Sequence, residues 1–258
     1  MAGSGAFDEL VAEGAAVPVA GWDFSWLAGR ATEERPPWGY ARSLGRRMAA
    51  ATAVVDLQTG GGEVYAEVVG GLDRPPRTVV ATEGWPPNVP VAAGSLRPYG
   101  GIVVAAADGP GLPFRDGAFD LVASRHPVST RWAEIARVLR PGGTFFSQQI
   151  GQGTMRELRE AMVGPLPPPT EQRSTATAVA AAEAAGLEVL DVRSATLPAA
   201  FHDIAAVVYF LRKVVWTVPD FTVDRYREPL RRLHERIRAD GPFVAHARRF
   251  LIEARKPG

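Results

Sequence analysis

The chain has 258 residues, 46% of them hydrophobic, and this length suits one large domain or two small ones with a well-buried core. Its 29 Lys and Arg side chains nearly balance its 28 Asp and Glu side chains, and the net charge of +1 disfavours a protein that coats a polyanion. Cysteine is absent, which excludes disulfide scaffolds, cysteine nucleophiles and thiolate metal sites, and no metal site is expected.

The apolar stretches of the chain are short. Residues 102–107 and 204–211 are among the longest, and both fall well below the roughly 18 residues that a membrane-spanning helix requires. The N-terminus lacks a basic start, and Asp8, Glu9 and Glu13 interrupt its apolar residues, so a signal peptide is not expected. We therefore expect a cytoplasmic protein without membrane contact, and the pattern gives no indication of an oligomeric state.

Residues 1–45 come first and carry Trp26 and Trp38 among Gly and Pro without a long helical period, so we interpret them as an N-terminal arm or lid. The remainder, residues 46–258, is expected to form one ligand-binding domain. Segments that are apolar on both faces predict buried parallel strands. These segments are residues 53–57, 77–82, 102–107, 119–123 and 144–147.

Helical patterns separate or follow these strands. They cover residues 63–69, 132–139 and 176–185, and further strands are predicted at 187–192 and 243–254. Residues 200–240 hold two more helical patterns, which we interpret as a helical insertion before the last strand. Strands that alternate with helices predict an α/β fold with a doubly wound, mostly parallel sheet and helices on both faces.

Acidic and glycine residues follow three of these strands. Asp56 precedes the turn Gly60-Gly61-Gly62, where a missing Cβ lets the backbone approach a ligand. Glu83 ends the second strand, where a carboxylate can accept both hydroxyls of a ribose. Asp108 ends the third strand and is placed to accept from an exocyclic amine. In such folds ligands bind at this edge of the sheet, so the sequence predicts a nucleoside site there.

The order of these motifs resembles the class I S-adenosylmethionine-dependent methyltransferases, of the type-11 group. Residues 54–62 resemble the glycine-rich first motif of that family, and Glu83 its ribose-binding acid. Asp108 with Leu112-Pro113-Phe114 resembles the turn near adenine, and residues 119–122 and 138–143 resemble the fourth strand and the turn before the fifth. The resemblance covers about residues 50–150. It implies a Rossmann-like sheet with an antiparallel last strand, and S-adenosyl-L-methionine as the cofactor.

The resemblance also implies which residues hold that cofactor. Trp85 is expected to stack on adenine. The full set of expected cofactor contacts is Asp56, Gln58, Thr59, Gly60, Gly62, Glu83, Trp85, Asp108, Gly109, Ser124 and Arg125.

Gln58 departs from the family pattern, which has Gly at this position. Gln does not adopt a positive φ cheaply, so the turn is expected to differ there, with the amide contacting the methionine end of the cofactor or with weaker cofactor binding. A dinucleotide-binding motif fits less well, because the bulky Tyr65 stands near the position where that motif needs a small residue. The acids would also repel phosphates and suit a cationic sulfonium.

His126 follows the fourth strand in Ser124-Arg125-His126, on a loop that faces the transferable methyl group in this family, and is the candidate general base. Gln148 and Gln149 end the fifth strand, and alternation lets only one of them face the ligand side. The candidate acceptor contacts are Trp26, Trp38, Gln149 and His202.

Three functions remain in competition. The first is methyl transfer to an O or N atom of a small molecule. The second is an RNA or protein methyltransferase that uses the Arg-rich stretch 225–238, although such a stretch is usually a solvated helix face and nucleic-acid binding is not favoured. The third, prompted by Gln58, is a protein that binds S-adenosylmethionine without turnover.

Overall fold

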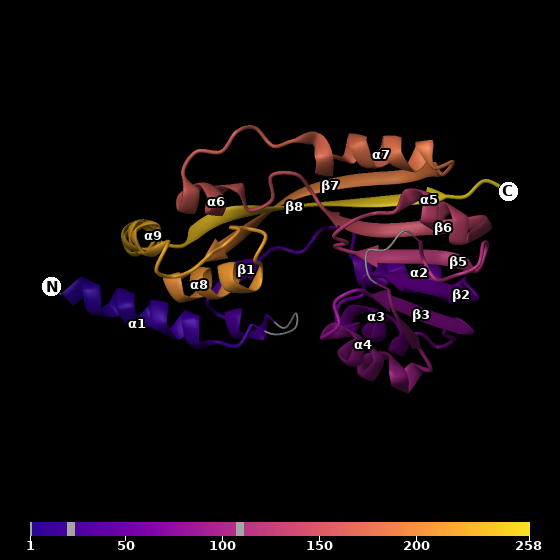
Figure 1. Cartoon of the computed structure of the whole chain (residues 1–258), viewed down its shortest axis with the longest axis horizontal. Coiled ribbons are helices and arrows are strands. Elements are labelled where there is room, and N and C mark those ends of the chain that lie inside the picture. The colour runs from indigo at the N-terminus through magenta and orange to yellow at the C-terminus, as the bar shows by residue number, and fades with distance from the viewer. Residues whose placement is uncertain (1, 20–23, 107–110) are drawn as a thin grey trace. The chain divides into compact units, whose positions relative to one another are not determined.

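The computed structural model describes residues 2–19, 24–106 and 111–258, and the chain divides into two compact units. One unit contains residues 36–152, 170–195 and 249–258, and we call it the sheet unit. The other contains residues 1–35, 153–169 and 196–248, and we call it the helical unit. Within the described residues, the strands form one eight-stranded sheet in the order β1-β7-β8-β6-β5-β2-β3-β4 (Figure 1).

The strands and helices of the sheet unit alternate along the chain. They are α2 (Tyr40–Ala49), β2 (Ala53–Leu57), α3 (Glu63–Gly70), β3 (Thr78–Glu83), α4 (Asn88–Leu96), β4 (Ile102–Ala105), β5 (Phe119–Arg125), α5 (Trp132–Val138), β6 (Leu139–Ile150) and α7 (Thr175–Ala184), with short 3-10 turns η2 (Arg97–Tyr99) and η3 (Glu171–Arg173). The strands β7 (Glu188–Phe201) and β8 (Phe243–Arg255) continue from one unit into the other.

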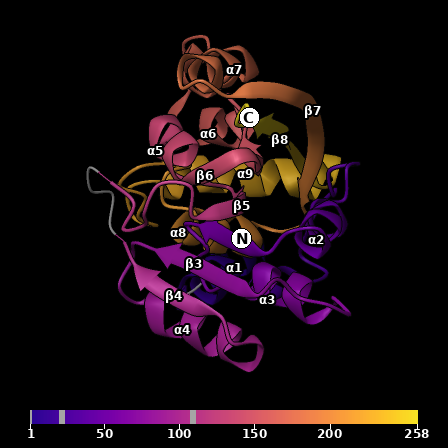
Figure 2. The same ribbon diagram turned by 90° about the vertical axis from the view of Figure 1, so that its right-hand side faces the viewer.

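The pairing within the sheet confirms the predicted fold class. Strands β4, β3, β2, β5 and β6 are neighbours joined by parallel pairs, and the labelled β4, β3, β5 and β6 follow one another from bottom to top in Figure 2. The last strand β8 pairs antiparallel with β6, from Thr144 opposite Arg255 to Ile150 opposite Arg249. This is the Rossmann-like arrangement with a reversed final strand that the sequence predicts.

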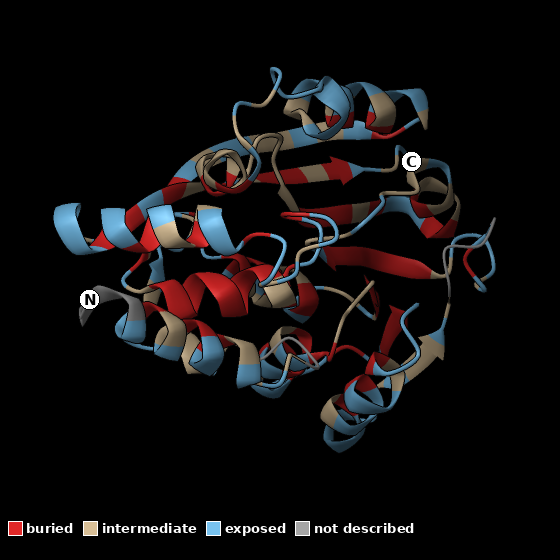
Figure 3. Cartoon of the chain, turned by 60° about the vertical axis from the view of Figure 1, so that its left-hand side comes forward, coloured by how far each residue is buried: buried red, intermediate tan, exposed pale blue. Residues whose placement is uncertain are grey.

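Alternating residues of the central strands build two separate cores, one on each face of the sheet. Because successive side chains of a strand point to opposite faces, both faces must be apolar when helices cover both. Val54, Ala81, Leu121 and Phe146 pack with α2 and α3, whereas Val55, Val80, Val122 and Phe145 pack with α5 and α7. The central strands are accordingly buried along most of their length (Figure 3).

Asp120 anchors the start of β2. Its buried Oδ2 accepts hydrogen bonds from the backbone N–H groups of Thr52 and Ala53, both at 2.6 Å, and Arg140 pairs with its other oxygen. This carboxylate fixes β5 against β2 at the edge of the sheet opposite to the predicted ligand site.

The helical unit contains α1 (Ala2–Ala16), η1 (Ser25–Leu27), β1 (Ala31–Glu33), α6 (Arg156–Val163), α8 (Ile204–Lys213) and α9 (Arg227–Asp240). The short β1 pairs antiparallel with the end of β7. Helix α8 is buried at nine of its ten residues, and α1 runs beside it (Figure 1). None of the helices in the described part of the chain is both long and apolar enough to cross a membrane.

Helix α1 and the long β7 differ from the sequence expectation. No helix is predicted for residues 1–45, yet α1 covers fifteen of them. A Cβ at Gly14 would lie 2.4 Å from the carbonyl oxygen of Ala205, so this glycine serves close helix packing and not a loop. The strand predicted at 187–192 continues through the exposed Arg193 and Ser194 to Phe201, and in this last part Leu197, Ala199 and Phe201 are buried at alternate positions.

Candidate active site

The turn between β2 and α3 forms the centre of the site. Gly60 has φ 65° and Gly62 has φ 76°, conformations that glycine adopts without strain. A Cβ on Gly62 would also touch Ala92 at 3.4 Å. The N–H of Thr59 donates to the carbonyl oxygen of Thr82 at 2.9 Å, which ties the turn to the end of β3.

Glu83 holds this turn from the end of the neighbouring strand. Its carboxylate is 7% exposed; Oε2 accepts from the N–H of Gly60 at 2.7 Å and Oε1 from the N–H of Trp85 at 2.8 Å. A carboxylate offers about four acceptor positions, so two hydrogen bonds leave capacity for the hydroxyls of a bound sugar. The half-exposed ring of Trp85 lies two residues further along the chain.

Asp56 is buried beside the same turn with its Oδ1 lacking a hydrogen-bond partner among the described residues. Burial raises the pKa of Asp56 to about 6, while a hydrogen bond with Thr59 and the nearby charge of Arg125 limit the rise. The hydroxyl of Ser124 is also buried without a partner in the described part of the chain. Buried polar groups without partners are costly in a folded protein, so this set fits a ligand that supplies donors, such as an ammonium group.

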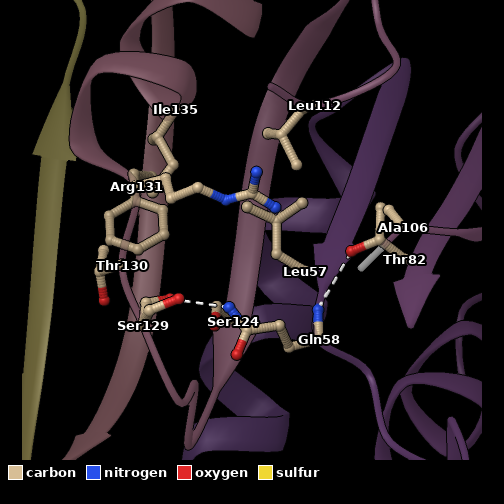
Figure 4. A pocket seen from close by; sticks show the side chains of 11 residues that line it. Leu57, Gln58, Thr82, Ala106, Leu112, Ser124, Ser129, Thr130, Arg131 and Ile135 are labelled. Atoms are coloured by element: carbon tan, nitrogen blue, oxygen red, sulfur yellow. Dashed lines mark hydrogen bonds between the residues drawn. The ribbon is translucent and has the colours of Figure 1, made fainter. Parts of the chain in front are cut away.

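Gln58 takes a left-handed conformation, with φ 57°. Gln58 therefore adopts the positive φ that a non-glycine residue was expected to avoid. The side chain is held by the loop after β5: its Nε2 donates to the carbonyl oxygen of Ser129 and its Oε1 accepts from the N–H of Val128, both at 2.7 Å. Figure 4 shows Gln58 beside Ser129, among the residues that line a small pocket with Leu57, Thr82, Ser124 and Arg131. Two backbone contacts thus stabilise a conformation that costs a non-glycine residue free energy.

His126 lies just beyond β5 and is held by Gln148 of β6. The N–H of His126 donates to the carbonyl oxygen of Gln148 at 2.7 Å, and the imidazole Nε2 lies 2.9 Å from the Gln148 side-chain Nε2. The indole Nε1 of Trp38 donates to Oε1 of the same amide at 2.7 Å. Burial, together with the charges of Arg125 and Arg249, keeps the pKa of His126 well below its usual value, so the ring is neutral at pH 7.

The contact between Gln148 and His126 is the one that the sequence analysis missed. Gln149 is the predicted contact instead. It lies on the opposite face of β6, and its Nε2 is buried without a partner in the described residues. Gln148 lies on the same face of β6 as Phe146, which packs with α2. Choosing between the two glutamines from the sequence would have required knowing that Trp38, just before α2, contacts this face.

The other predicted site residues do not all gather here. Asp108 and Gly109 lie outside the described residues. Trp26 and His202 belong to the helical unit, where Trp26 contacts Tyr209 with ring centroids 5.1 Å apart and the N–H of His202 donates to the carbonyl oxygen of Arg30. Their assignment as acceptor contacts stays a prediction.

Comparison with known proteins agrees with this arrangement. A family model described as a methyltransferase domain matches residues 55–147. A malonyl-[acyl-carrier protein] O-methyltransferase of Geobacter sulfurreducens is 41% identical over 63 residues, which is 22% of this chain and only 24% of that protein. The chain thus matches about a quarter of the length of this relative.

Solved structures share the fold. The YcgJ protein of Bacillus subtilis is 18% identical with a TM-score of 0.61, over 85% of this chain and 98% of that one. A phosphoethanolamine N-methyltransferase 2 of Haemonchus contortus, solved with phosphomonomethylethanolamine and S-adenosylhomocysteine, is 16% identical with a TM-score of 0.50, over 86% of this chain and 53% of that one. Together with the glycine turn and its two acids, the family match indicates a methyltransferase domain in residues 55–147.

Proposed function

We propose that this protein is an S-adenosylmethionine-dependent methyltransferase that acts on an O or N atom of a small molecule. The observation that carries the proposal is the carboxylate of Glu83, which is buried at the strand end and bridges the N–H groups of Gly60 and Trp85. This geometry fixes an acid, a glycine turn and an exposed aromatic ring around one space, as recognition of an adenosine requires.

The residues of the sheet unit fit the donor. Glu83 would accept hydrogen bonds from the ribose hydroxyls, and the ring of Trp85 would stack on adenine. The orphaned oxygen of Asp56 would accept from the amino group of the methionine end. When bound, this cofactor supplies a methyl group on a positively charged sulfur. The acids stabilise that charge, whereas they would repel the phosphates of a dinucleotide.

Two observations support a small acceptor. The name of the Geobacter relative assigns it O-methylation of a malonyl group on a carrier protein. In addition, three of the five arginines of α9 make contacts within the helical unit: Arg227 pairs with Asp8 at 2.5 Å, Arg231 lies over the ring of Phe7, and Arg236 lies over the ring of Phe243. Arginines in such contacts favour a packed helix face over an RNA-binding surface.

Calorimetric titration with S-adenosylhomocysteine tests the proposal. Glu83→Gln keeps the size of the side chain and removes its charge, and we expect the Kd to rise at least tenfold, since hydrogen bonds to a charged group are worth about 1.5–3 kcal/mol. Glu67→Ala, on the exposed face of α3, serves as the control and leaves the Kd unchanged. Failure of the wild-type protein to bind, or equal Kd values for wild type and Glu83→Gln, would contradict the proposal.

A further inference from the structure

We propose that His126 is a fixed hydrogen-bond donor that, together with Arg125, binds an anionic methyl acceptor such as a carboxylate, and that Gln148 and Trp38 are the residues that position it. This inference rests on the proposed function and names the substrate class of the same site. It also replaces the general-base role that the sequence suggests for His126.

The argument starts at Trp38, which is 8% exposed. An indole N–H is a donor and never an acceptor, so the Gln148 atom 2.7 Å from Trp38 Nε1 must be the amide oxygen. The other end of the amide, which faces His126, is therefore the NH2 group. Trp38 thereby fixes an orientation that amides otherwise leave open.

The orientation of Gln148 in turn fixes the tautomer of His126. The amide NH2 is a donor, so the imidazole Nε2, 2.9 Å away, must accept and carry no proton. In a neutral ring the proton then sits on Nδ1. The backbone bond between the His126 N–H and the Gln148 carbonyl holds the ring in place. Since the lone pair of Nε2 is occupied and Nδ1 already bears hydrogen, the ring donates a hydrogen bond and does not remove a proton.

The charges around the His126 ring indicate which kind of acceptor atom its N–H binds. Two cationic side chains, Arg125 and Arg249, lie close enough to disfavour a proton on His126. Arg125 is exposed at the end of β5 and makes no ion pair with the other described residues, although its charge also acts on the buried Asp56. A neutral N–H donor beside a guanidinium suits an anionic oxygen, because both donors stabilise the charge. The same positive field disfavours a protonated amine as acceptor.

A carboxylate acceptor also makes a general base unnecessary. A carboxylate oxygen forms the new bond to the methyl carbon, the carbon–sulfur bond breaks, and its electron pair remains on sulfur. The products are a methyl ester and S-adenosylhomocysteine, and no proton is released. The site then has only to align the acceptor and to exclude water.

The tautomer can be measured without any substrate. The chain has four histidines, so nitrogen NMR of histidine-labelled protein gives few signals, and the His126→Asn spectrum assigns the one of interest. We expect a neutral Nδ1–H ring at pH 7. A neutral Nε2–H ring, or a protonated ring, would overturn the inference while leaving the donor site untouched.

A near-isosteric variant tests the positioning role. In Gln148→Glu the carboxylate still accepts from Trp38 but now also accepts from His126, so we expect the proton to move to Nε2 and the pKa of the ring to rise. Gln149→Glu makes the same chemical change on the opposite face of β6 and should leave the His126 tautomer unchanged. Unchanged His126 signals in Gln148→Glu would refute the role of Gln148.

The acceptor class is tested with labelled S-adenosylmethionine and a panel of carboxylic acids, each beside its own primary amide. We expect methyl esters from the acids and no product from the amides. Asn tolerates the positive φ of 56° at position 126 and supplies an N–H donor but no base. His126→Asn should therefore keep activity close to that of wild type, whereas His126→Ala should lose about 10- to 100-fold, the range that corresponds to one hydrogen bond to a charged group.

Two results would overturn the acceptor class. The first is that no acid in the panel is methylated by a protein that binds S-adenosylhomocysteine in the calorimeter. The second is equal loss of activity in His126→Asn and His126→Ala, which a base would produce. Absence of S-adenosylhomocysteine binding would instead contradict the proposed function itself, so the two failures are distinguishable.

Discussion

At the scale of single residues, the site keeps groups that folding alone does not favour. Asp56 is buried with an oxygen that has no partner among the described residues, and Gln58 takes a left-handed conformation. Such groups persist when the surrounding structure fixes them, and they are concentrated at functional sites. Both residues lie next to the turn that follows β2, so these energetically unfavourable groups are located at the candidate ligand site.

Asp56 carries the first prediction. Its folded-state pKa of about 6 exceeds the ordinary value of 3.8, so the folded protein binds a proton that the unfolded chain releases between these pH values. Stability therefore falls as the pH rises from about 4 to 6, by up to ~3 kcal/mol in total for two pKa units. Asp56→Asn should raise the free energy of unfolding at pH 7 by ~1–3 kcal/mol, measured by urea denaturation.

The pH dependence is the control for this prediction. At pH 4.5 the folded wild-type carboxyl is already protonated, so most of the gain from Asp56→Asn should vanish. The same variant should bind S-adenosylhomocysteine more weakly, because the amide cannot replace the carboxylate opposite an ammonium group. A variant that is less stable than wild type at pH 7, or a gain of equal size at both pH values, would contradict this account.

At the scale of elements, the central strands were predictable and the N-terminal helix was not. Val54 and Val55 are adjacent and both apolar because each face of the sheet has its own core. This pattern can be recognised within one strand segment. Gly14 in α1 reads as a helix breaker until Ala205 is known to pack against it. Gln148 is a similar case, since its role depends on Trp38, 110 residues away. Contacts between distant segments carry information that local patterns do not contain.

Asp120 gives a prediction at this scale. Asp120→Ala removes the acceptor of the Thr52 and Ala53 N–H groups at the start of β2, so we expect a loss of ~2–3 kcal/mol in the free energy of unfolding. Arg140→Ala removes only the more exposed partner, and surface ion pairs contribute ~1 kcal/mol or less. Denaturant titration of both variants checks this; equal losses would show that the two backbone bonds are not the stabilising contact.

At the scale of the whole molecule, the balance of charge argues against a nucleic-acid partner. The net charge is +1, and three of the five α9 arginines contact Asp8, Phe7 and Phe243 within the helical unit. We therefore expect no binding of a fluorescent single-stranded RNA at 50 mM salt in an anisotropy titration, at protein concentrations up to about 10 μM. Tight binding that weakens steeply with added salt would favour the RNA methyltransferase instead.

A crystal structure of the protein with S-adenosylhomocysteine tests the central claim most directly. We predict electron density for the adenosine beside Glu83 and Trp85, with the amino group of the homocysteine end within hydrogen-bond distance of Asp56 Oδ1. Density for the ligand at any other place, or an adenosine at this turn that leaves Glu83 and Asp56 without contact, would contradict the account.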